Sequence, residues 1–229
     1  MTFAGDADFG PEATLDGHLA DDYLRLRLDW FDRHLRRDPA VADPLSSPVR
    51  LFVMGGGTGR RTAQDRLDHG GRWRDEADWP PPAVEATAFH LSGDGGLSRA
   101  IPEAGERSWR HDPDNPVPTI GGAIASGAPL MEAGGFDQRE TFDLYGASMP
   151  GRALADRDDV VTFQTEVLIQ AVEVTGPVSA RLWISASALD CDVMIKLVDV
   201  YPPNTDYPEG YALNLTHGVL RLRFRDGFE

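Results

Sequence analysis

The stretch VMIKLVDVYP, residues 193–202, is rich in β-branched residues and ends at a proline. This composition is typical of a β-strand, and a proline normally stands at a strand's end. Similar runs lie on both sides of it. They are DVVTFQTEVL (159–168), QAVEVTG (170–176), VSARLWISAS (178–187) and VLRLRFR (219–225). Short strands separated by turns at this spacing predict a mainly β protein built as a sandwich or jelly roll.

Alternation along these runs predicts which side chains form the core. In residues 178–187 one strand face is uniformly apolar, whereas the other is polar except for Trp183. Successive side chains of a strand point to opposite faces, so we expect Leu182 to be buried and Ser185 to be exposed. The apolar face consists of Val178, Ala180, Leu182, Ile184 and Ala186. The same logic places Ile195 and Leu197 inward.

The preceding half of the chain is less regular. VRLFVMG (49–55) and EATAFHLS (85–92) are predicted strands, whereas residues 99–158 are rich in Gly, Pro and Asp and predict a long loop region. GRWRDEADWPPP (71–82) ends in three prolines, which remove backbone donors. We therefore expect it to run extended along a surface, outside any regular helix or strand.

One segment has a clear helical period. In LADDYLRLRLDWFDRHLR (19–36) the apolar residues recur at helical spacing in two adjacent stripes, which make a wide apolar face. Pro39 ends the predicted helix. The remaining sequence contains no second strong helix to cover that face. We therefore expect Leu24, Leu28, Phe31 and Leu35 to be only partly covered within this chain.

Composition excludes several classes of function. The net charge of −15 argues against nucleic acid and anionic membranes as partners. Cys191 is the only cysteine, so the chain forms no internal disulfide and no cysteine-ligated zinc cluster. No apolar run is long enough to span a membrane, and no signal peptide is visible, which favours a cytoplasmic location.

The sequence contains no complete active site. GASMP (146–150) is the nearest match to a nucleophile elbow, but Pro150 replaces its second glycine, so Ser148 is predicted to be a loop serine. GGG (55–57) lacks the following Gly-Lys-Ser/Thr of a phosphate loop. GDADFG (5–10) and DPDN (112–115) are incomplete as calcium loops. The histidines, none of them paired at metal-site spacing, are His18, His34, His69, His90, His111 and His217. We predict no catalytic, cofactor-binding or metal residue, and no cofactor.

Several stretches, taken in order, resemble one known family. They are RLDWFDRHL, SPVRLFVMGGG, DEADWPPP, HDPDNPVPTIGG, FDQRE, DDVVTFQTEVL, VEVTGPVSARLWISASALDCDVMIKLVDVYP and LTHGVLRLRFRDGFE. Together they are similar to the CocE/NonD-type serine hydrolases, which share a C-terminal domain with X-Pro dipeptidyl-peptidases. Those proteins consist of an α/β-hydrolase domain, which cleaves acyl bonds with a Ser-Asp-His triad, followed by a jelly-roll β-sandwich of the galactose-binding type.

The resemblance implies a division of the chain. Residues 1–42 would be the C-terminal remnant of the α/β-hydrolase domain, and 43–229 the β-sandwich, incomplete at its C-terminus. No residue here matches the family's triad, so whether the chain by itself is an enzyme is left open. The implied partner is the α/β-hydrolase domain of a parent protein. Trp73 and Trp79 would lie near the junction with that domain, or alternatively fill the edge of the sandwich itself. The alternative is a stand-alone β-sandwich that binds a ligand.

Overall fold

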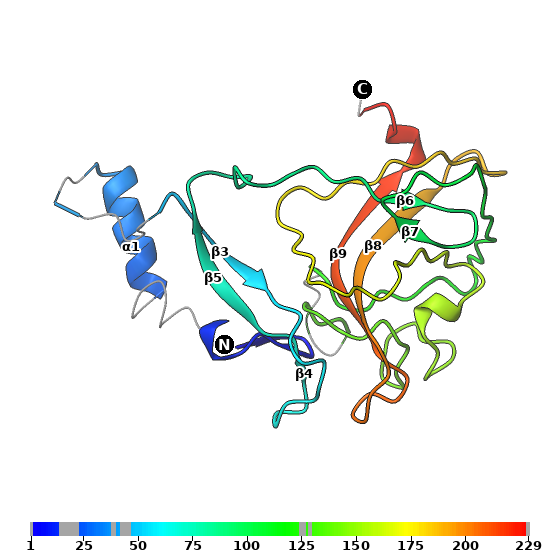
Figure 1. Ribbon diagram of the computed structural model, residues 1–229, viewed down its shortest axis with the longest axis horizontal. Helices are drawn as coiled ribbons and strands as arrows, with labels where there is room; N and C mark the ends of the chain where they lie inside the picture. The colour runs from blue at the N-terminus through cyan, green and yellow to red at the C-terminus, as the bar shows by residue number, and fades with distance from the viewer. Residues whose placement is uncertain are drawn as a thin grey trace. The chain divides into compact units, whose positions relative to one another are not determined.

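The structure is a computed structural model, and it describes residues 2–13, 23–37, 40–41, 47–123, 127 and 130–227 (Figure 1). The chain divides into two compact units. The first unit comprises Met1–Ala86 and Gln170–Pro177, and the second comprises Thr87–Ile169 and Val178–Glu229. This division differs from the predicted boundary between residues 42 and 43, which stays a prediction.

The first unit contains two small sheets. Strands β1 (Phe3–Ala4), β2 (Ala7–Asp8) and β4 (Leu67–Asp68) lie in that order, with β1 antiparallel and β4 parallel to β2. The second sheet pairs β3 (Val49–Met54) antiparallel with β5 (Gly71–Glu76). A short 3-10 helix, η1, spans Pro11–Ala13. Ala7, Val53 and Leu67 are buried between these elements.

Strand β5 corrects one expectation. Residues 71–76 of the predicted irregular segment form a regular strand, in which Trp73 lies opposite Phe52 with the ring centroids 5.3 Å apart. The three prolines (80–82) follow the end of the strand, so they remove no backbone N–H that β5 needs for pairing with β3. Trp79 follows the strand and is about half exposed.

Helix α1 (Tyr23–His34) confirms the helical period. Residues 19–22 of the predicted helix lie outside the described residues. The four leucine and phenylalanine side chains expected to be only partly covered are all exposed, from 43% for Phe31 to 69% for Leu35. Arg25 and Asp29 form an ion pair one turn apart on the helix, and Asp32 pairs with Arg36, two residues beyond its end.

The second unit is organised around one long hairpin. Strands β8 (Asp192–Tyr201) and β9 (Tyr211–Arg221) are antiparallel over their whole length, with a bulge at Leu197/Val198 (Figure 1). Gly210 has a φ of +78°, and a Cβ there would lie 2.7 Å from the Tyr201 carbonyl, so only glycine suits the end of this loop. The remaining elements are β6 (His90–Leu91), β7 (Leu97–Ser98), and the 3-10 helices η2 (Leu154–Asp156) and η3 (Leu222–Phe224).

The core of the second unit lies where an irregular segment runs beside β9. The Gln138 amide donates to the Ala212 carbonyl, and Asp137 bridges to Leu213. Leu213 is 2% exposed. The other buried apolar side chains of this unit are Ile120, Leu154, Tyr207 and Tyr211.

The strand predictions are confirmed in part. The run at 193–202 forms β8, and 49–55 forms β3, but only His90–Leu91 of the run at 85–92 is a strand, and β9 ends at Arg221 before η3. The predicted strands at 159–168, 170–176 and 178–187 are wrong: all of these residues are described, and none belongs to a strand. The predicted face of residues 178–187 is wrong too, because Val178 and Leu182 are exposed. The chain is nonetheless mainly β, consistent with a β-sandwich, while its jelly-roll topology stays a prediction.

Candidate functional site

A buried carboxylate, Glu140, organises the loop that contains the candidate serine. Its side chain is fully buried, and its Oε2 accepts hydrogen bonds from the amides of Ser148 (2.6 Å) and Met149 (2.7 Å). Its Oε1 accepts from Arg152 Nη2 at 2.8 Å and lies 3.6 Å from Arg157 Nη1. The backbone closes the same loop, since Glu140 and Arg152 are hydrogen-bonded neighbours.

These contacts determine the charge state of Glu140. Burial alone would raise the pKa of the carboxyl, but the hydrogen bonds from the Met149 amide, Arg152 and the Ser148 amide outweigh it. The pKa is therefore lowered from 4.5 to about 2. Glu140 is ionised throughout the physiological range, so it is a fixed counter-charge for the two arginines and cannot exchange protons as a general acid or base near neutral pH.

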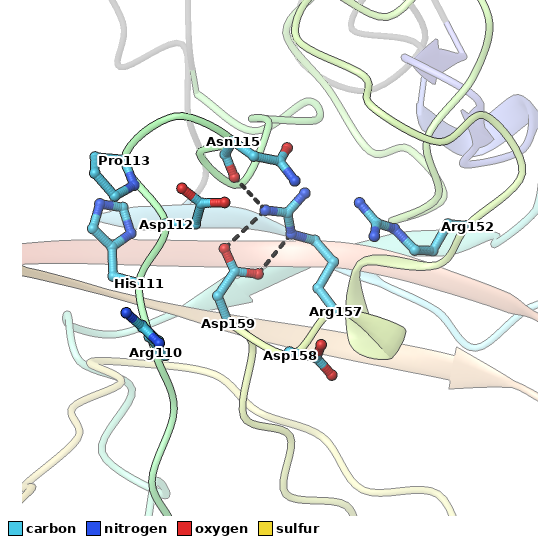
Figure 2. A pocket seen from close by; sticks show the side chains of 9 residues that line it. All are labelled: Arg110, His111, Asp112, Pro113, Asn115, Arg152, Arg157, Asp158 and Asp159. Atoms are coloured by element: carbon cyan, nitrogen blue, oxygen red, sulfur yellow. Dashed lines mark hydrogen bonds and ion pairs between the residues drawn. The ribbon is translucent and has the colours of Figure 1, made fainter.

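Arg157 links this carboxylate to a second one. Its Nε and Nη2 donate to the two oxygens of Asp159 at 2.7 and 2.8 Å, and Nη2 also donates to the Asn115 carbonyl at 2.6 Å (Figure 2). The two side chains are almost completely buried. The hydrogen bond from Arg157 lowers the pKa of Asp159. This bidentate pair holds residues 157–159 against the loop that contains Asn115.

A pocket of about 500 Å³ opens beside this pair. Figure 2 shows Arg157 and Asp159 at its centre, with His111 and Pro113 on one side and Arg152 on the other. The pocket is lined by Arg110, His111, Asp112, Pro113, Asn115, Arg152, Arg157, Asp158 and Asp159. Its central charges neutralise one another, and none of its lining residues is a serine, cysteine or threonine nucleophile. The pocket therefore has the chemistry of a structural ion-pair network.

Comparison with known proteins agrees with this chemistry. Residues 44–229 match the family described as the X-Pro dipeptidyl-peptidase C-terminal non-catalytic domain. The chain belongs to that family. The cocaine esterase of Rhodococcus sp. (strain MB1 Bresler) is 39% identical over 211 residues, which are 86% of this chain and 30% of the esterase. The chain thus spans less than a third of this relative's length. No solved structure matches the chain.

In an X-Pro dipeptidyl-peptidase C-terminal non-catalytic domain, the contacts of Ser148 matter because a serine hydroxyl needs a base to become a nucleophile. Its hydroxyl accepts a hydrogen bond from Arg152 Nη2 at 2.8 Å, and its amide is held by Glu140. An arginine cannot take the hydroxyl proton, because its guanidinium is always protonated. Ser148 thus serves the loop's own hydrogen bonding. That the chain lacks catalytic, cofactor-binding and metal residues stays a prediction.

The structure scatters the other candidate residues. His34 lies against Trp30 at the end of α1 with the rings tilted by 40°, His69 is buried in the first unit, His90 begins β6, and His217 lies on β9. His111 lines the pocket, and His18 lies outside the described residues.

The glycine-rich and acidic candidate stretches have local structural roles. A Cβ on Gly57 of the GGG stretch would clash with the backbone of Asp68, as expected of a tight turn. GDADFG (5–10) contains the turn between β1 and β2 at residues 5–6 and strand β2 itself, and the Asp112 carboxylate of DPDN accepts the Asp114 amide. Among the described residues, no group of three His, Cys, Asp or Glu side chains could hold a metal ion. None of the described helices is long and apolar enough to cross a membrane.

Sequence reasoning missed the residues that organise this site. Glu140, Arg157 and Asp159 lie in the two charged clusters DQRE (137–140) and RDD (157–159), inside or beside the predicted loop region. Charge clusters usually lie in solvent, so the sequence did not indicate that these are buried. The signal that could have found them is that each cluster places opposite charges side by side within an otherwise Gly- and Pro-rich region.

Proposed function

We propose that this chain is the non-catalytic portion of a CocE/NonD-like serine hydrolase that acts on ester or amide bonds, and that it packs on an α/β-hydrolase domain. The family description supports the non-catalytic role, and the 39% identical relative is an esterase. The observation that carries the packing role is the exposed apolar face of α1. In this proposal the chemistry belongs to the hydrolase domain, and the chain supplies a scaffold.

The exposed face of α1 has the composition of an interface. Five large apolar side chains of one short helix segment are 43–69% exposed: Leu24, Leu28, Trp30, Phe31 and Leu35. A contiguous apolar patch of this kind marks a surface that another protein part covers. Trp30 and Phe31 are edge-to-face, with centroids 5.3 Å apart, and aromatic residues are enriched at interface cores. We assign residues 1–42, which contain α1, to the hydrolase side of the junction.

A binding experiment tests the packing role. The part of the Rhodococcus cocaine esterase that the chain does not match is expressed separately, and its co-elution with this chain is followed by size-exclusion chromatography. We expect the wild-type chain to bind and Leu28→Glu to lose binding, since a charge would be buried against an apolar surface. Val219→Glu, at an apolar side chain on β9 that is more exposed than Leu28 (67% against 50%), is the control and should still bind. Equal binding by Leu28→Glu and the wild type would contradict the proposal.

A further inference from the structure

The pocket of the second unit has an inner wall whose charges are paired and a rim whose charges are not. On the inner wall, Arg157 is shared by Asp159 and Glu140. At the rim, the side chains of Arg110 and Asp158 are exposed, and within the described part of the chain neither has an ion-pair or hydrogen-bond partner. Figure 2 shows them on either side of Asp159. The rim therefore offers free N–H donors and a free carboxylate acceptor to the same pocket.

The inner wall has one donor without an acceptor. The Arg157 side chain is 3% exposed, and its Nη1 is buried with no hydrogen-bond partner among the described residues. Glu140 Oε1 lies 3.6 Å from this nitrogen, too far for a hydrogen bond. Figure 2 shows the unbonded end of the guanidinium pointing away from Asp159, on the side of the pocket towards Arg152. A buried donor without an acceptor is costly, so a ligand oxygen at the inner end of the pocket would stabilise it.

The neighbouring carboxylates determine which kind of oxygen suits this position. Glu140 and Asp159 both lie against Arg157, so the positive charge of the guanidinium is already neutralised. A ligand carboxylate or phosphate at Nη1 would bring a further negative charge close to both of them, without a further buried cation to pair with it. A hydroxyl brings no charge, and it both accepts and donates hydrogen bonds. Hydroxyls of one molecule can therefore accept from Arg157 and Arg110 and donate to Asp158.

We propose that this pocket binds a small, neutral, polyhydroxyl molecule of the monosaccharide class. One hydroxyl oxygen accepts from Arg157 Nη1 at the inner end, while others accept from Arg110 and donate to the Asp158 carboxylate at the rim. The pocket volume of about 500 Å³ lies within the range of small-ligand sites, about 300–1,000 Å³. All the lining residues belong to the second unit, so the proposal does not depend on packing against a hydrolase domain.

Ligand-observed NMR tests this proposal on the full chain. The neutral probes are the methyl glycosides of glucose, mannose and galactose, and each is compared with its uronic-acid counterpart, which differs only by a carboxylate. Saturation-transfer titrations give the dissociation constants. We expect saturable binding of at least one neutral probe, with a dissociation constant on the order of 1 mM. Its uronic acid should bind about tenfold more weakly, because its carboxylate is repelled by Glu140 and Asp159.

Two rim variants locate the binding in this pocket. Asp158→Ala and Arg110→Ala each remove one free polar group and should weaken binding of the neutral probe by roughly three- to tenfold. Asp156→Ala is the matched control, since Asp156 is an exposed aspartate two residues away that does not line the pocket, and it should leave binding unchanged. If one rim variant fails to fold by circular dichroism, the other decides.

Four results would overturn the proposal. They are no saturable binding of any neutral probe, a uronic acid that binds as tightly as its neutral counterpart, binding that no folded rim variant weakens, and equal weakening by Asp156→Ala.

Discussion

At the scale of single residues, Glu140 is the fully buried carboxylate that joins the loop of Ser148 to two arginines. It is buried, it receives two backbone amides, and it lies between Arg152 and Arg157. Exposed ion pairs contribute little to stability, whereas a buried charge that loses its partner is costly. The loss of stability on substituting Glu140 therefore depends on the two buried arginine charges that lose this partner, and not on the carboxylate alone.

Glu140→Gln should destabilise the second unit by about 2–4 kcal/mol, because it leaves Arg152 and Arg157 without their shared counter-charge. Urea unfolding followed by tryptophan fluorescence and circular dichroism measures the change. Asp192→Asn is the control, since Asp192 pairs with Arg221 on an exposed part of the hairpin and its loss should leave the unfolding midpoint unchanged. A similar midpoint shift for both variants would mean that Glu140 is not the buried centre of the network.

The same carboxylate predicts a pH dependence. A pKa lowered on folding contributes stability that is fully present above the unfolded value and is lost as pH falls through the folded value. For Glu140 this window runs from 4.5 down to about 2. The stability difference between the wild type and Glu140→Gln should therefore be constant from pH 7 to about 5 and narrow between pH 4.5 and 2. Thermal melts of both proteins across this range test it, and a difference that widens towards acid would refute the assignment.

At the scale of elements, burial distinguishes two leucines that the sequence treats alike. Leu213 on β9 is 2% exposed, whereas Leu182 is 37% exposed. Leu213→Ala should cost about 2–5 kcal/mol, since it leaves a cavity. Leu182→Ala should cost about 1 kcal/mol or less, because less of its surface leaves water on folding. Thermal melts compare the two identical substitutions, and a larger shift for Leu182→Ala would restore the buried strand face expected from the alternating pattern.

The elements also show how far sequence patterns reach. The period of α1 and the β-branched composition of β3 and β8 are local properties, and those elements were predictable. Residues 178–187 alternate equally well, but a strand needs a hydrogen-bonded neighbour, which local sequence does not specify. The one bridge in the predicted strands at 159–187 joins Gln164 to Gly96. The Glu140 network and the hydrogen bonds that Gln138 and Asn214 make beside β9 depend on contacts up to 80 residues apart in the chain, between Gly134 and Asn214, so no local pattern could indicate them.

At the scale of the whole molecule, the chain folds into two compact units, and its buried charged side chains form ion pairs that neutralise one another. The described part has an exposed apolar face on α1 and a pocket whose central charges neutralise one another, and its candidate serine is engaged by Arg152 and Glu140. The description of the family as a non-catalytic domain agrees with these contacts. The central claim is therefore that acyl hydrolysis requires a hydrolase domain that this chain does not itself provide.

The most direct measurement is a steady-state assay of the purified chain with p-nitrophenyl esters and X-Pro p-nitroanilides. We expect no turnover: at most a stoichiometric release of p-nitrophenol from the esters, as amino groups of the chain become acylated, and nothing from the amides. Sustained release over many equivalents per chain, abolished by Ser148→Ala, would show that the chain is catalytic by itself and identify the loop serine as a nucleophile.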